Sequence, residues 1–69
     1  MIQVNKMEAF ALVVKALDKN DAVTASEIMK IIKKSMVFDK EKNQFSEMIE
    51  ISNKKDERVY ENAKLKYDK

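Results

Sequence analysis

The sequence has no glycine, no proline, no cysteine and no histidine among its 69 residues. The lack of cysteine excludes disulfides and thiolate zinc sites. Histidine is the usual proton shuttle near neutral pH, and glycine lets a backbone close around a phosphate, so most common active-site designs are excluded as well. We therefore expect a protein that is not an enzyme and that holds no cofactor.

One acidic segment, residues 39–50, partly follows the ligand spacing of an EF-hand calcium loop. Where such a loop needs glycine for its sharp turn, this segment has Gln44. Its apolar residues also fit a helical stripe better than a loop. We expect no metal site here, although the segment carries oxygen-bearing side chains at Asp39, Glu41, Asn43, Glu47 and Glu50.

The residues that are present favour a small folded domain. Hydrophobic residues make up 45% of the chain and the formal net charge is only +2, whereas disordered chains combine low hydrophobicity with high net charge. Charged residues reach 38%, and abundant lysine and glutamate without helix breakers is a helical composition. A chain of 69 residues has room for one domain with a small core.

No apolar run approaches the roughly 20 residues that span a bilayer, and the first residues lack the pattern of a secretory signal. We therefore expect no membrane association and a cytoplasmic location. The composition, rich in lysine and asparagine and free of glycine and proline, is typical of an AT-rich genome such as that of many phages or low-GC bacteria. An origin in a phage or other mobile element would suit the size and composition of the chain.

Hydrophobic periodicity predicts three helices, at residues 6–18, 24–35 and 40–52. Thr24 and Glu27 fit a capping box at the start of the second helix, and Asp39 is the expected cap of the third. Before the first helix, Ile2 and Val4 favour a short extended segment. In a chain without glycine, Asn20 is the natural residue for a left-handed turn position.

The C-terminal part allows two structures. The apolar stripe of the third helix continues through Val59, Ala63 and Tyr67, so that helix runs on or restarts at Asp56. Alternatively, residues 58–60 and 64–67 form a small hairpin, whose turn would lack the glycine that tight hairpins favour. The prediction is a mainly α fold: a small three-helix bundle with a helix-turn-helix-like arrangement, ending in a long third helix or a minimal C-terminal β-hairpin.

Residues 21–28, Asp-Ala-Val-Thr-Ala-Ser-Glu-Ile, follow an apolar helix. Over residues 7–34 the chain thereby resembles the entry to the second helix of winged-helix and other helix-turn-helix domains. The resemblance implies a DNA-binding regulator with its recognition helix at 40–52 and a wing at 58–67. Acidic residues at 41, 47 and 50 run against this implication, because phosphates repel carboxylates. The residues that would contact nucleic acid are Lys30, Lys33, Lys34, Lys40, Lys42, Asn43 and Gln44.

The breadth of the first helix favours a different function. Its apolar side chains cover roughly 260° of the helix, more than two short helices are expected to bury. Exposed apolar area of this kind indicates a protein partner or a second copy of the chain. The five methionines fit either an adaptable binding groove or ordinary core filling. We expect a small regulatory protein, an adaptor or inhibitor, whose interface residues are Leu12, Val13, Ala16, Tyr60 and Tyr67.

Overall fold

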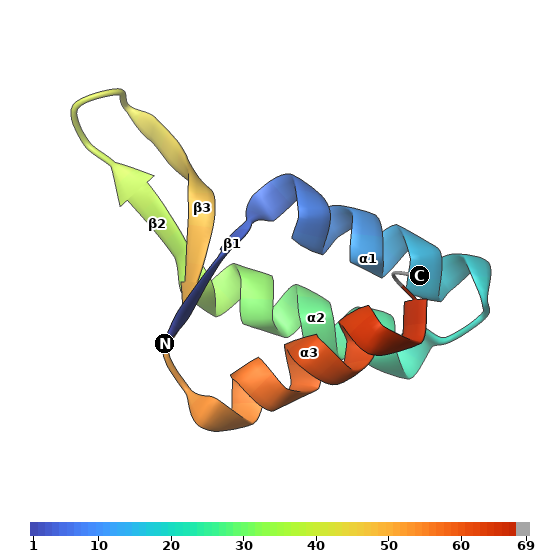
Figure 1. Cartoon of the computed structure of the whole chain (residues 1–69). Coiled ribbons are helices and arrows are strands. Elements are labelled where there is room, and N and C mark those ends of the chain that lie inside the picture. The colour runs from blue at the N-terminus through green and yellow to red at the C-terminus, as the bar shows by residue number, and fades with distance from the viewer. Residues whose placement is uncertain (68–69) are drawn as a thin grey trace.

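The computed structural model describes residues 1–67, which form three helices and one three-stranded antiparallel sheet (Figure 1). The sheet makes the fold α+β, so the prediction of a mainly α three-helix bundle is wrong. Its strands lie in the order β1-β3-β2. Along the chain the elements are β1 (Ile2–Asn5), α1 (Lys6–Asp18), α2 (Ala22–Ser35), β2 (Met36–Asp39), β3 (Gln44–Ile51) and α3 (Lys54–Tyr67).

The predicted third helix, residues 40–52, is instead a turn followed by β3. Its apolar residues satisfy a helical stripe and a strand pattern equally well, and pairing with two distant segments decides between them. Ile49 lies opposite Val4 of β1 and Met36 of β2, so β3 is the central strand. A winged-helix recognition helix at 40–52 is therefore absent from this fold.

The turn between β2 and β3 uses asparagine where most hairpins use glycine. Asn43 has a φ of 52°, in the left-handed region that asparagine tolerates. The carboxylate of Asp39 accepts hydrogen bonds from the backbone N–H groups of Glu41 (3.0 Å) and Lys42 (3.4 Å). Asp39 therefore closes a turn and does not cap a helix.

Several local predictions are confirmed. Helix α1 spans the predicted residues 6–18, β1 lies at the predicted extended segment, and Asn20 has a φ of 59°. Helix α2 begins two positions earlier than predicted, because the carboxylate of Asp21 accepts from the N–H of Thr24 at 3.1 Å. Asp21 is the N-cap, and the predicted Thr24–Glu27 capping box is wrong.

The C-terminal segment is a helix, α3, and the alternative hairpin or wing at 58–67 is wrong. It begins at Lys54 after strand β3, so it is a separate helix and neither a continuation of the predicted third helix nor its restart at Asp56. The side chain of Asn53 accepts hydrogen bonds from the N–H groups of Lys55 (2.8 Å) and Asp56 (3.4 Å), which supplies the missing partners at the helix start.

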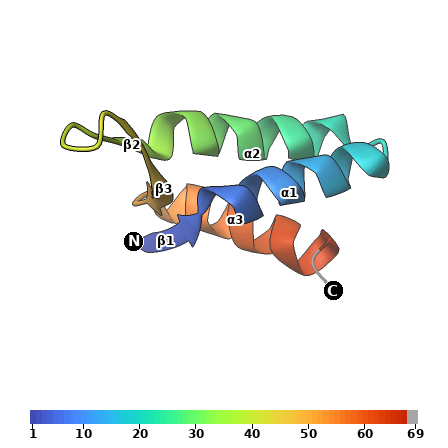
Figure 2. The ribbon, with the colours of Figure 1, turned by 90° about the horizontal axis from the view of Figure 1, so that it is seen from above.

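Helices α1 and α2 run antiparallel and in contact, and α3 packs across both (Figure 2). The sheet lies at the end where α1 begins and α2 ends, and the β2–β3 hairpin projects beyond the helices (Figure 1). Within the described residues 1–67, no helix is long and apolar enough to cross a membrane. The core joins all three helices to β3 and contains Ala9, Leu12, Val13, Ala16, Ala25, Ile28, Ile31, Ile32, Ile49, Ile51, Tyr60 and Ala63.

Candidate functional site

The residues predicted as a protein interface on α1 lie in the core. Leu12, Val13 and Ala16 are 3%, 7% and 0% exposed. They pack against α2 and α3, so they are inaccessible to a partner while the chain is folded. The aromatic candidates are also occupied: Tyr60 is 3% exposed, and the Tyr67 hydroxyl donates to the carboxylate of Asp21.

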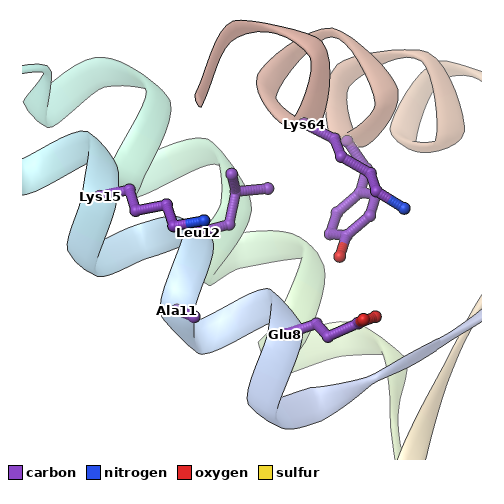
Figure 3. Close-up of a pocket in the computed structure, with 6 residues that line it drawn as sticks. Glu8, Ala11, Leu12, Lys15 and Lys64 are labelled. Atoms are coloured by element: carbon purple, nitrogen blue, oxygen red, sulfur yellow. The ribbon is translucent and has the colours of Figure 1, made fainter. Parts of the chain in front are cut away.

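A shallow hollow of about 100 Å³ marks the seam between α1 and α3 (Figure 3). Leu12 and Tyr60 line it, with Glu8, Lys15 and Lys64 around it. Its size fits a few water molecules, and it combines cations with a carboxylate and a phenol. This seam therefore offers no apolar surface of the kind the sequence led us to expect.

Exposed apolar residues lie on another side of α1. Met7, Val14 and Leu17 are 68%, 60% and 54% exposed. The first helix thus leaves apolar area uncovered, but on the opposite part of its stripe from the predicted residues. The spacing of apolar residues in the sequence predicted how wide this stripe is, whereas the packing of α2 and α3 determines which part of it is buried.

An apolar hollow of about 300 Å³ lies where α1, α2 and β2 meet, and Phe10, Met29 and Met36 line it. A second hollow, of about 450 Å³, lies between the start of α1 and the hairpin, and Met7, Met36 and Phe45 line it. Met36 borders both, so the two hollows adjoin. We call this surface the apolar groove and define it by Met7, Phe10, Met29, Met36 and Phe45.

The shape of the hairpin explains why one wall of the groove is exposed. Between the pairs Met36–Ile49 and Phe38–Phe45, residues 46–48 of β3 lie opposite Val37 alone, which is a bulge-like shift in register. Bulges bend a strand and increase its twist. The hairpin projects past the helices (Figure 1), and Phe45 is 48% exposed and contacts Phe38 edge-on with ring centroids 5.2 Å apart.

Lysines dominate the rim of the apolar groove. Lys30 and Lys33 of α2 border the first hollow, and Lys6 borders the second. One carboxylate, that of Glu47, lies among the lining residues. Neither Lys30 nor Lys33 belongs to an ion pair within the part of the chain that the structure describes. The rim is therefore net positive, and two of its cations have no carboxylate partner.

The residues predicted to contact nucleic acid come from two places, the C-terminal half of α2 and the hairpin. Lys30 and Lys33 lie beside the groove, but Lys34 pairs with Asp56 of α3 at 2.6 Å. The remaining predicted contacts are at or next to the hairpin turn: Lys40, Lys42, Asn43 and Gln44, the last of which also lines the second hollow of the groove. The sequence clue that does point to the groove is methionine, because three of the five methionines line it.

Comparisons with protein-family models, curated proteins and solved structures found no match to this chain. Among residues 1–67, no cluster of three or more carboxylate, histidine or cysteine side chains is placed to hold a metal ion. The apolar groove is the surface feature from which a function can be inferred.

Proposed function

We propose that this chain is a small non-enzymatic regulatory or adaptor protein that binds a protein partner in the apolar groove. The observation that carries the proposal is the gathering of partly exposed Met7, Phe10, Met29 and Phe45 around Met36 in a chain of this size. Small monomers rarely leave contiguous apolar area uncovered unless it binds something. Methionine suits such a surface because its unbranched side chain adapts to different shapes.

A second candidate function, DNA binding, is supported by Lys30 and Lys33 on α2, which belong to no ion pair among residues 1–67. Two features favour the protein partner. In a helix-turn-helix the two helices cross at about 90–120°, whereas α1 and α2 lie antiparallel along each other (Figure 2). The surface between the lysines is apolar, and phosphates do not reward burial of apolar side chains.

Site-specific photo-crosslinking in the source cells tests this function. A photoreactive phenylalanine analogue replaces Phe45 in the groove or, as a control, Leu65, which is 72% exposed on α3. The expected result is a crosslinked protein of discrete mass from position 45, unaffected by nuclease and lost when Met29→Ser is added. Equal crosslinking from both positions, or a product that depends on nucleic acid, would contradict the proposal.

A further inference from the structure

From the charges around the apolar groove we infer the chemistry of the partner: an amphipathic helix with acidic residues beside its apolar face. This inference rests on the proposed function and adds to it the class of segment that the groove receives. Three observations support it. Lysines surround the groove, the residues that line it come from several elements, and a second copy of the chain fits it poorly.

The rim selects for negative charge. Lys30 and Lys33 are exposed, flank the hollow formed with Phe10, Met29 and Met36, and lack carboxylate partners in the described chain. A partner that covers the hollow brings its flanking side chains close to these ammonium groups. Acidic side chains at these positions are attracted to the ammonium groups and speed the association of the partner, whereas basic side chains are repelled. Glu47, at the hairpin side, offsets only part of this positive charge.

The construction of the groove favours a helix over an extended strand. The five residues that define it come from α1, α2 and the β2–β3 hairpin, so the groove crosses several elements and does not follow the edge of one strand. A strand would have to pair with a free edge of the sheet, and the two edge strands, β1 and β2, have 4 residues each. Short edge strands give few backbone hydrogen bonds to an added strand. An apolar groove of this kind instead receives anchor side chains spaced along one face of a helix.

A second copy of the chain fits the groove poorly. In a two-fold symmetric dimer the same patch meets itself. The patch carries Lys6, Lys30 and Lys33 but only one carboxylate, that of Glu47, so two grooves packed together would bring two net positive surfaces into contact. The outer face of α3 could enter the groove only head to tail, and its exposed large apolar residue is Leu65 alone among the described residues. We therefore expect the groove to bind a protein other than a second copy of this chain.

The test is a selection from a library of random 16-residue peptides on the folded full-length chain. The counter-target is the variant M29S/F45S, which removes two groove residues without changing the net charge. Circular dichroism of M29S/F45S first confirms that it is folded. We expect the recovered peptides to repeat apolar residues at helical spacing, to carry net negative charge and to become helical on binding. They should bind M29S/F45S at least about tenfold more weakly than the parent chain.

Matched charge reversals then separate rim attraction from net charge. Lys33→Glu should weaken binding of the selected peptides about tenfold, and high salt should reduce that difference. Lys55→Glu changes net charge equally on α3, which contributes no residue to the groove, and should alter affinity less than about twofold. Equal effects of the two reversals would overturn the inference.

The other outcomes are distinct. Groove-dependent peptides that are neutral or basic, or that bind in an extended form, would overturn the acidic helix and leave the proposed function standing. Self-association that M29S/F45S abolishes would assign the groove to a second copy. Duplex DNA bound with loss in Lys33→Glu but not in M29S/F45S would assign the lysines to phosphates. Failure to recover any groove-dependent peptide would overturn the inference, and lack of a position-45 crosslink would separately overturn the proposed function.

Discussion

The hydroxyl of Tyr67 donates a hydrogen bond to the carboxylate of Asp21, joining the end of α3 to the turn between α1 and α2. The same carboxylate accepts from the hydroxyl of Thr24 at 2.7 Å and from the ammonium of Lys66 at 3.0 Å. The hydrogen bond from Tyr67, followed by those from Thr24 and Lys66, lowers the pKa of Asp21. In turn, the hydrogen bond to Asp21 raises the pKa values of Lys66 and Tyr67.

These pKa shifts predict stability that falls at both ends of the pH range. Because the folded-state pKa of Asp21 is lowered, its contribution is present above its unfolded value of about 4 and is lost as acid protonates the folded carboxylate. The raised pKa values of Lys66 and Tyr67 give contributions present below about pH 10 and lost as alkali deprotonates the folded groups. Asp21→Asn should lower the melting temperature near pH 7 and flatten both limbs.

Thermal melts followed by circular dichroism from pH 2 to pH 11 measure this dependence. Tyr67→Phe is the matched variant, since it keeps the ring and removes only the donor. It should reduce the alkaline limb while leaving the N-cap contact between Asp21 and Thr24. An unchanged pH profile in Asp21→Asn would show that these contacts do not govern stability.

Two leucines of α1 are expected to respond in opposite ways to the same substitution. Leu12→Asp removes a leucine side chain that is 3% exposed and puts a carboxylate into the core, at a cost that is a large part of the roughly 5–15 kcal/mol that stabilise a typical domain, so the chain should unfold. Leu17→Asp changes a residue that is more than half exposed, and the chain should stay folded. Far-ultraviolet circular dichroism and size-exclusion chromatography distinguish the two. A folded Leu12→Asp chain would contradict the core assignment.

The hairpin turn depends on the left-handed backbone at Asn43. Asn43→Val should destabilise the fold by about 1–2 kcal/mol, because a side chain branched at Cβ clashes in this conformation. Asn43→Gly should be neutral within about 0.5 kcal/mol, since glycine adopts positive φ freely. Urea unfolding curves give both values. If the valine variant matched the glycine variant, the turn would have a different backbone geometry.

The ion pair between Lys34 and Asp56 links α2 to α3, with the lysine side chain 58% exposed. A double-mutant cycle with Lys34→Ala and Asp56→Ala should give a coupling of about 0.2–1 kcal/mol at low salt, the usual range for partly exposed pairs. Raising the salt concentration should reduce it. A coupling near zero at low salt would mean that this contact adds nothing to the packing of α3.

Strand β3 lies where the apolar pattern of the sequence predicted a helix. Residues 45, 48 and 49 form a helical stripe, and nothing local excludes it. What excludes it is pairing of Ile49 with Val4 and Met36, at long separations along the chain. Because the chain has no glycine, the usual signal of a tight turn is missing between β2 and β3. Asn43 nevertheless has a left-handed backbone like that of Asn20, and asparagine is the residue that tolerates it in both turns.

The amino-acid sequence by itself determined the first helix, the short extended segment before it and the left-handed Asn20, because each depends on neighbouring side chains and local backbone preferences. For the C-terminal segment it left a helix and a hairpin open, and the structure has the helix. Tertiary structure decided that β3 is a strand and which part of α1 faces the solvent. Burial is shared among distant elements, so no local pattern states which side of a broad apolar helix its neighbours will cover. The apolar groove depends on this tertiary packing, since it lies between the uncovered side of α1, the C-terminal half of α2 and the hairpin that projects past the helices.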